Sequence, residues 1–237
     1  MEQREVSVVI PARDEEENIG LLVENLRERL GGEEIEIIVV DDHSSDGTAR
    51  IVRQSGGKGL NIRLVENRGE PGFANALRAG FERAEGRFIV PVMADSCDRL
   101  ETILEMREKA RRGYDLVCGS RYMKGGRREG GPLVQGMFSR LVGETLHVLA
   151  GIPTRDVANS FKLYRRRFLE GITLAEKGFA VSMEAALKFF FNGGKIAEVP
   201  TVWSGREKGA SKFKMSRTFP YVALYIRAVL LPWTFRS

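Results

Sequence analysis

A pair of adjacent carboxylates directly follows an apolar run early in the chain. Residues 37–40 are Ile-Ile-Val-Val, which is typical of a buried strand, and Asp41 and Asp42 come next, ahead of a Ser-Ser-Asp-Gly-Thr stretch that contains Asp46. Ligands of open α/β sheets bind beyond the carboxyl ends of the strands. Carboxylates at such an end accept hydrogen bonds from a base or a ribose, or hold a divalent metal. The alternative interpretation is structural: Asp42 turns the chain and Asp46 caps the next helix.

Two further apolar runs also end in acidic residues. Residues 6–10 precede a Pro-Ala-Arg-Asp-Glu stretch that ends at Glu15, and residues 88–93 precede Asp95 and Asp98. Because the carboxyl ends of parallel strands share one edge of a sheet, we expect the three acidic clusters to meet there. For Glu15 the alternative is that it only stabilises the first turn of a helix through the helix dipole.

Basic segments follow predicted strands in the second half of the chain. Arg121 comes directly after the apolar run 115–118, within Gly-Ser-Arg-Tyr, and Arg206, Ser211 and Lys212 lie in an Arg-Glu-Lys-Gly-Ala-Ser-Lys segment. Guanidinium groups pair with phosphate through parallel hydrogen bonds, and lysine and serine donate to the same oxygens. A solvated run of surface charges is the alternative. The coincidence of the two segments favours an anion site.

Taken together, these motifs resemble the inverting family 2 glycosyltransferases of the GT-A fold, and the resemblance covers most of the chain. They are similar in particular to the dolichol-phosphate mannose synthases and other polyprenyl-phosphate glycosyltransferases. The resemblance implies a GDP- or UDP-sugar donor, with GDP-mannose favoured, and Mg²⁺ or Mn²⁺ held by Asp95 and Asp98. The residues implied to bind the nucleotide are Pro11, Arg13, Glu15, Asp42, Asp46 and Asp95.

The chain departs from the family pattern in two places. Met93 stands where the family carries the first Asp of an Asp-Ala-Asp motif, and Arg13 and Asp14 stand where it carries an aromatic residue and Asn. Mg²⁺ needs only one or two protein carboxylates when diphosphate oxygens and water complete its octahedron. We therefore expect a reduced metal site. The alternative is a non-catalytic adaptor that binds a nucleotide sugar and recruits partners.

The resemblance also implies a polyprenyl phosphate acceptor and, as catalytic residues, Asp95, Arg121 and Asp156. The acceptor phosphate would be bound by Arg121, Arg206, Ser211 and Lys212. A phosphate monoester is already anionic near neutral pH, because its second pKa is about 6. It needs no general base, and the resemblance to inverting enzymes implies a single displacement with inversion. A transferase acting on a soluble acceptor stays open as the alternative, and Asp156 or Glu184 would be its first candidate base.

Strand-like and helical patterns alternate along the chain. Helical spacing of apolar residues between the apolar runs predicts a largely parallel, Rossmann-like sheet flanked by helices. In the second half we expect a flexible basic loop at 125–132, helices at 134–149 and 181–191, and strands at 160–164 and 195–203.

The composition shows no break that would divide the chain into separate domains. We expect one glycosyltransferase domain over 1–237, with a nucleotide-sugar half (1–120), an acceptor half (121–217) and a C-terminal amphipathic helix (218–237). The apolar run within this helix is shorter than the roughly 20 residues that a spanning helix needs, and Arg227 interrupts it. With aromatic residues at both ends it is typical of a membrane-interface helix, and packing on the core is the alternative.

The composition indicates in which cellular compartment the protein works and which partners it binds. Only two cysteines occur, and the polar start shows no signal peptide, so we expect a cytoplasmic protein held peripherally at the cytoplasmic face of a membrane. The formal charge of +5 is concentrated in basic clusters that could meet nucleic acid, anionic lipid or a phosphorylated substrate. Aromatic residues that stack on bases are sparse in those clusters, so we expect no nucleic-acid partner.

Overall fold

Strands and helices alternate through the residues that the computed structural model describes, which are 4–30, 34–56, 61–205 and 218–236. The strands are β1 (Val6–Ala12), β2 (Ile35–Asp41), β3 (Asn61–Glu66), β4 (Phe88–Pro91), β5 (Leu116–Ser120), β6 (Arg127–Glu129), β7 (Lys162–Arg165), β8 (Ile196–Pro200) and β9 (Val202–Ser204). The helices are α1 (Ile19–Leu30), α2 (Thr48–Ser55), α3 (Phe73–Arg83), α4 (Thr102–Arg111), α5 (Leu133–Ala150), α6 (Arg166–Glu170), α7 (Val181–Phe191) and α8 (Phe219–Leu230), followed by a 3-10 turn, η2 (Pro232–Phe235).

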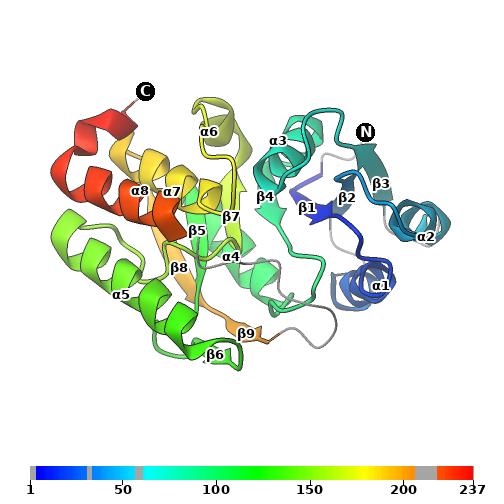
Figure 1. Ribbon diagram of the computed structural model, residues 1–237, viewed down its shortest axis with the longest axis horizontal. Helices are drawn as coiled ribbons and strands as arrows, with labels where there is room; N and C mark the ends of the chain where they lie inside the picture. The colour runs from blue at the N-terminus through cyan, green and yellow to red at the C-terminus, as the bar shows by residue number, and fades with distance from the viewer. Residues whose placement is uncertain (1–3, 31–33, 57–60, 206–217, 237) are drawn as a thin grey trace.

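Within these residues, seven strands form the main sheet in the order β3-β2-β1-β4-β7-β5-β8 (Figure 1). Strand β1 pairs in parallel with β2 and β4, and β5 pairs in parallel with β8, whereas β7 is antiparallel to both of its neighbours. The strand order reverses direction between β1 and β4. Such a switch point opens a crevice beyond the carboxyl ends of the two strands.

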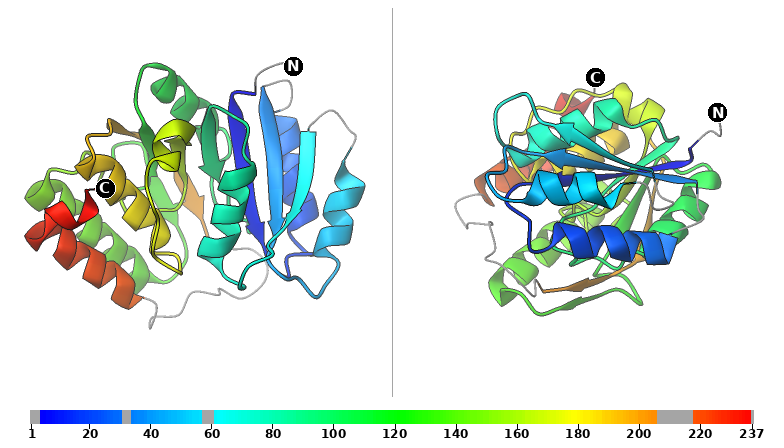
Figure 2. Two further views of the ribbon diagram at one scale, coloured as in Figure 1. Left: turned by 90° about the horizontal axis from the view of Figure 1, so that it is seen from above. Right: turned by 90° about the vertical axis from the view of Figure 1, so that its right-hand side faces the viewer.

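Helices cover both faces of the main sheet (Figure 2). On one face α1, α2 and α4 share a core with strand residues such as Val8 and Ile37, and on the other α3, α5, α7 and α8 share a core with residues such as Val9 and Ile38. Successive strand residues point to opposite faces, so a strand covered on both sides is apolar throughout, as β1 is. The predicted α/β architecture with a mostly parallel sheet is confirmed.

Two expectations for the second half are wrong. The sequence predicts one strand over 195–203, but the structure breaks it at Thr201, so that β8 pairs with β5 while β9 pairs with β6 in a second, two-stranded sheet. Thr201 is buried; its N–H donates to the Ser120 carbonyl at 3.1 Å and its carbonyl accepts from the Arg127 N–H at 3.0 Å. The predicted loop at 125–132 contains β6 because this pairing with β9 orders it.

Helix α8 lies where the sequence predicts a C-terminal helix, but it is apolar on both faces and not amphipathic. One face packs on the core through Tyr221, Leu224 and Ala228, while Val222 and Ile226 on the other face are exposed. Among the described residues, no helix has the length and apolar character that crossing a bilayer requires.

A buried carboxylate lies at the end of the sheet opposite to the crevice. Glu36, near the start of β2, is fully buried, and its Oε1 atom accepts hydrogen bonds from the Ser7 hydroxyl at 2.6 Å and the Glu85 N–H at 2.7 Å. Its Oε2 atom accepts from Arg63 Nη2 at 2.7 Å. This carboxylate therefore ties β1, β2, β3 and the start of β4 together.

We predict that Glu36→Gln lowers the free energy of unfolding by about 1–3 kcal/mol, because the amide nitrogen cannot accept a hydrogen bond and one of the donors from Ser7, Glu85 or Arg63 is left without its acceptor. Glu34→Gln, at an exposed position two residues earlier, is the matched control and should change little. Denaturant unfolding measures the loss. Nucleotide affinity should stay within about twofold of the parent, because Glu36 and the crevice lie at opposite ends of β2; a parallel loss of affinity would contradict this separation.

Candidate active site

A cleft of ≈ 870 Å³ opens at the carboxyl ends of β1 and β4 and continues to α5 and α8. The predicted residues that line it are Pro11, Arg13, Glu15, Asp42, Asp95 and Arg121. Asp46, Asp98 and Asp156 are not among its lining residues. Arg206, Ser211 and Lys212 lie outside the described residues, so their assignment stays a prediction.

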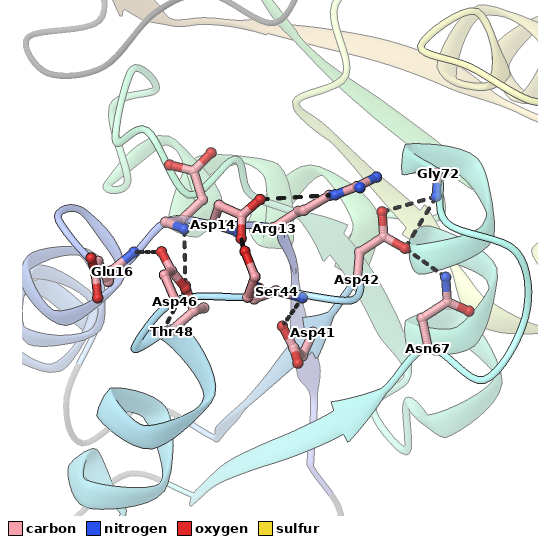
Figure 3. Close-up of polar contacts among 12 residues, drawn as sticks. Arg13, Asp14, Glu16, Asp41, Asp42, Ser44, Asp46, Thr48, Asn67 and Gly72 are labelled. Atoms are coloured by element: carbon pink, nitrogen blue, oxygen red, sulfur yellow. Dashed lines mark hydrogen bonds and ion pairs between the residues drawn. The ribbon is translucent and has the colours of Figure 1, made fainter.

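The loops that follow β1 and β2 are joined by reciprocal hydrogen bonds (Figure 3). The Asp14 N–H donates to the Ser44 hydroxyl at 3.1 Å, and Asp14 Oδ1 accepts from the Ser45 N–H at 2.8 Å. Asp14 and His43 both have left-handed backbone conformations, with φ of 52° and 61°. Asp and Asn tolerate this conformation better than most residues, which explains why a short polar residue occupies position 14.

Asp42 and Glu15 are acceptors held in fixed orientations inside the cleft. The buried Asp42 carboxylate accepts from Asn67 Nδ2 at 2.7 Å and from the Gly72 N–H at 2.9 Å (Figure 3). Glu15 is also buried, and its Oε2 atom accepts from Asn18 Nδ2 at 2.8 Å. Carboxylates whose orientation is already set lose little freedom when they accept a ligand donor.

Asp46 has contacts that fit the structural alternative. Its Oδ1 atom accepts from the Thr48 N–H at 2.9 Å and its Oδ2 atom from the Glu16 N–H at 3.1 Å. Partial burial opposes ionisation, but these hydrogen bonds outweigh it and lower the pKa of Asp46. Asp46 therefore joins the two loops. Its predicted contact with the nucleotide stays a prediction, because the Asp46 carboxylate is engaged in these bonds and does not line the cleft.

The segment after β4 carries the predicted metal ligands. Met93 and Asp95 are half-buried and line the cleft, whereas Asp98 is buried next to it. Among the described residues, Asp98 Oδ1 has no hydrogen-bond partner. Burial and the charge of Asp95 raise the pKa of Asp98 to about 7. A bound cation would stabilise the ionised form of two neighbouring carboxylates, one of which has an oxygen without a hydrogen-bond partner.

Few side chains near Asp95 and Asp98 could ligate a metal ion. The described residues contain no group of three or more His, Cys, Asp or Glu side chains placed to hold a metal. Asp95 and Asp98 suit Mg²⁺ or Mn²⁺ when a diphosphate supplies further oxygens, because such ions are commonly held by one or two carboxylates and the substrate phosphates. The residues present therefore fit a divalent ion that binds together with the nucleotide.

Arg121 and Asp156 form a buried, bidentate ion pair. Arg121 Nε and Nη2 donate to Asp156 Oδ2 and Oδ1 at 2.7 Å and 2.8 Å, and the Arg121 N–H donates to Oδ2 at 2.9 Å. Although burial opposes it, the Asp156 charge raises the pKa of Arg121, which stays cationic. Helix α5 approaches this pair at Gly143, where a Cβ atom would lie 1.9 Å from the Arg155 carbonyl oxygen. Asp156 thus positions Arg121, which lines the cleft.

The sequence does not predict the part of the cleft wall that β6, β9 and α5 form. Arg128 of β6 and Trp203 of β9 are register partners, and the Arg128 guanidinium lies 5.0 Å from the centre of the Trp203 ring. Both line the cleft, and so does Ser139 of α5, whose hydroxyl accepts from Arg121 Nη2 at 3.1 Å. The basic cluster around Arg128 was visible in the sequence, but the β6–β9 pairing that directs one of its members into the cleft was not.

The two candidate bases for a soluble acceptor are both engaged elsewhere. Glu184 is buried on α7, and its carboxylate accepts from the Ala175 N–H at 2.9 Å and the Glu176 N–H at 2.8 Å. Asp156 is fully buried against Arg121. Neither lines the cleft, so neither stands where it could take a proton from an acceptor hydroxyl.

We predict that Met93→Asp keeps the fold and tightens Mn²⁺ binding in the presence of a nucleotide diphosphate by about tenfold, because a second cleft-facing carboxylate joins Asp95. Calorimetry with Mn²⁺ and melting curves together test this. Glu17→Gln, at an exposed acidic position after the β1 loop, is the control and should leave Mn²⁺ affinity unchanged. A melting temperature lowered by more than about 8 °C, without a gain in affinity, would show that the Met93 side chain is needed for packing.

Comparison with curated proteins shows three relatives that carry related names. The chain is 32% identical over 232 residues to the dolichol-phosphate mannosyltransferase of Pyrococcus furiosus, covering 96% of this chain and 64% of that protein. It is 28% identical to the polyprenol monophosphomannose synthase of Mycolicibacterium smegmatis, covering 88% and 81%. It is 30% identical to the dodecaprenyl-phosphate galacturonate synthase of Rhizobium johnstonii, covering 91% and 63%. The chain thus spans less than two thirds of the length of two of these relatives.

Comparison with solved structures identifies the fold. Glucosyl-3-phosphoglycerate synthase from Mycobacterium tuberculosis, solved with Mn²⁺, UDP and glucosyl-3-phosphoglycerate, superposes with a TM-score of 0.71 at 20% identity over 95% of this chain and 80% of that one. A second mycobacterial protein gives 0.72 at 22% identity, over 95% and 75%. The predicted GT-A fold is confirmed. Residues 7–173 match the model of glycosyl transferase family 2, and the chain belongs to this family.

Proposed function

We propose that the protein transfers a sugar from a nucleotide-diphosphate sugar to a polyprenyl phosphate by a single displacement with inversion. The observation that carries the choice of acceptor is the composition of the cleft wall around α5. Two cations, Arg121 and Arg128, line it, whereas the candidate bases Asp156 and Glu184 do not. Such a wall suits an acceptor that is already anionic and needs no deprotonation. The three curated relatives are named for transfer to polyprenyl carriers.

On the donor side, Glu15 and Asp42 would accept hydrogen bonds from the nucleoside. We favour GDP-mannose as the donor, because two of the three relatives are named for mannose transfer. The structural neighbour solved with UDP makes a UDP-sugar the first competitor to test. A thermal-shift panel of nucleoside diphosphates with and without Mn²⁺ separates the two, because a ligand that binds only the folded state raises its stability.

Asp95 and Asp98 would hold Mg²⁺ or Mn²⁺ together with the diphosphate. Support comes from the unsatisfied Asp98 oxygen and from the neighbouring structures that contain these ions with UDP. A bound divalent ion would stabilise the negative charge that develops on the departing diphosphate.

Arg121 and Arg128 would orient the acceptor phosphate. Asp156 and Ser139 hold the Arg121 guanidinium, and Trp203 supports that of Arg128, so both cations are positioned before the acceptor arrives. Holding the phosphate in line with the donor converts an encounter between two anions into a reaction within one complex. Since the acceptor is a lipid, we place the reaction at the cytoplasmic face of a membrane, with the protein bound peripherally.

Substitution of Asp95 tests whether the protein is an enzyme or the non-catalytic adaptor that Met93 suggests. We predict that Asp95→Ala abolishes single-turnover sugar transfer and the Mn²⁺-dependent part of nucleotide binding, and that Asp98→Ala costs less, because Asp95 faces the cleft directly. Glu17→Ala, an exposed acidic position after the β1 loop, is the matched control. Nucleotide binding without any turnover by the parent protein would favour the adaptor, and equal turnover by the Asp95 variant would refute its role.

A second prediction concerns the proposed acceptor site. Arg128→Ala and Arg121→Ala should each lower acceptor efficiency by about ten- to a hundredfold, because each removes a charge-assisted hydrogen bond of roughly 1.5–3 kcal/mol, while the nucleotide affinity of the folded protein stays nearly unchanged. Arg121→Ala should also lower the melting temperature, because it leaves the buried Asp156 without its countercharge. Arg121→Lys should rescue only partly, because lysine cannot reproduce the planar fork that Asp156 holds.

The matched control for Arg128 is Arg127→Ala. Arg127 is its exposed neighbour on β6 and pairs with Glu129 at 2.5 Å. Kinetics at varied concentrations of a short, water-soluble prenyl phosphate measure acceptor efficiency. Calorimetry measures nucleotide affinity. If the variants lose nucleotide affinity and keep acceptor dependence, these cations serve the diphosphate.

A further inference from the structure

Charged side chains from two helices fix the backbone of the segment between α6 and α7, residues 171–179, which contains no helix or strand. From α3, Arg78 Nη2 donates to two carbonyl oxygens of the segment at 2.8 and 2.7 Å. From α7, the buried Glu184 carboxylate accepts from two of its N–H groups at 2.9 and 2.8 Å. Lys188 of the same helix donates to the Thr173 carbonyl. We call residues 171–179 the α6/α7 segment.

The α6/α7 segment ends in an aromatic side chain that lines the cleft. This residue, Phe179, stacks on Phe73, the first residue of α3, with ring centres 4.4 Å apart and an angle of 27° between the ring planes. Phe73 lines the cleft as well. We call these two residues the aromatic pair. Because each ring packs against the other and the segment behind Phe179 is bound on two sides, the pair forms a wall of set orientation.

The aromatic pair lies next to the loop that orients Asp42. Phe73 directly follows Gly72, whose N–H donates to the Asp42 carboxylate, and Asn67 donates to the same carboxylate (Figure 3). In Figure 3 these two donors lie together on one side of Asp42, and Arg13 lies on the other. We therefore expect the nucleoside to approach Asp42 from the Arg13 side. The aromatic pair then remains for a part of the donor other than its base.

The other flank of the α6/α7 segment approaches the cation of the proposed acceptor site. Burial raises the pKa of Tyr221 of α8, and the charges of Arg121 and Glu176 act on this hydroxyl with smaller, opposite effects. Tyr221 lines the cleft and therefore lies near both the segment and Arg121. The aromatic pair thus lines the cleft between the proposed nucleoside side and the proposed acceptor side. The sugar must lie between these sides when the acceptor attacks its anomeric carbon.

A pyranose ring suits an aromatic wall. One face of a hexose carries mainly C–H groups, which pack on the electron-rich face of an aromatic ring, while the hydroxyl groups remain available to polar partners. The prenyl chain does not need this wall, because other apolar side chains, Phe138 and Val142 of α5, line the cleft near Ser139, which holds Arg121. Of the parts of the two substrates, the hexose is the one that fits the aromatic pair.

We propose that Phe73 and Phe179 form the subsite for the hexose of the donor, and that Arg78, together with Glu184, is a positioning residue that holds Phe179 in this subsite. The proposal rests on the proposed transfer from a nucleotide-diphosphate sugar and names the side chains that the sugar contacts. It also gives Glu184 a role other than that of a base.

Calorimetry with a nucleoside diphosphate and with its nucleotide sugar, both in Mg²⁺, tests the subsite. The probes are GDP with GDP-mannose and UDP with UDP-glucose. Phe179→Ala should weaken binding of the nucleotide sugar by about tenfold, because it uncovers apolar area of the hexose, and leave the affinity for the diphosphate within about twofold. Phe179→Tyr keeps the flat ring and should bind as the parent does. Phe191→Ala, at a half-buried phenylalanine of α7 that does not line the cleft, is the matched control and should change neither affinity.

Substitution of Arg78 tests the positioning role. Arg78→Ala should lower the affinity for the nucleotide sugar relative to that for the diphosphate, as Phe179→Ala does. Arg78→Lys should do so to a smaller extent, because lysine keeps the charge and loses the planar group that bonds two carbonyl oxygens. Arg83→Ala, at the exposed end of α3, is the control. A merely structural role would lower the melting temperature and leave the ratio of the two affinities unchanged.

Three outcomes overturn the proposal. Equal losses for diphosphate and nucleotide sugar in Phe179→Ala would assign the aromatic pair to the nucleotide, a loss confined to acceptor efficiency would assign it to the acceptor, and the absence of any loss would leave it without a ligand. The binding measurements need no acceptor, so they are separate from the proposed function. If the parent binds the sugar through Phe179 but transfers it to no prenyl phosphate, the proposed acceptor fails while the subsite stands. If the parent binds neither pair of probes, both proposals fail.

Discussion

The buried ion pair of Arg121 and Asp156 is the interaction on which the α5 side of the cleft, the proposed acceptor site, depends. It joins the end of β5 to the segment before β7, and through Ser139 it also holds α5. Removing one partner would leave an uncompensated buried charge, which typically costs 3–5 kcal/mol. The pair therefore fixes the position of the Arg121 guanidinium, which we propose meets the acceptor phosphate, and at the same time it limits how far the surrounding elements can move without breaking it.

The donor side is ordered by a different means. Non-glycine residues with left-handed backbone conformations follow three strands of the sheet: Asp14 after β1, His43 after β2 and Ser96 after β4. Such conformations cost free energy and persist where neighbouring contacts compensate them, and they are concentrated at functional sites. Here the reciprocal bonds between the first two loops supply that compensation, so that the loops that carry Asp42 and Glu15 are held together.

The sheet and the acidic loops could be predicted from sequence because each depends on a local pattern, an apolar run that ends in polar residues. The roles of Asp46 and Asp156 could not, because they depend on the partners that each carboxylate meets: Glu16 and Thr48 for Asp46, and Arg121 for Asp156. The break at Thr201 was also hidden, since both strands that it joins carry the same kind of residues. Pairing between distant segments, which put Arg128 in the cleft, leaves no periodic signal in either one.

The small β6–β9 sheet differs in stability from the rest of the cleft. Two-stranded sheets are marginally stable by themselves, and this one is attached to the main sheet where β8 turns into β9 at Thr201. The donor loops, by contrast, follow strands in the middle of a doubly covered sheet. We therefore expect local opening of the wall that carries Arg128 and Trp203 to cost less free energy than a rearrangement of the loops after β1, β2 and β4. If the proposed function is correct, entry of the acceptor and retention of the nucleotide would be controlled by separate parts of one cleft.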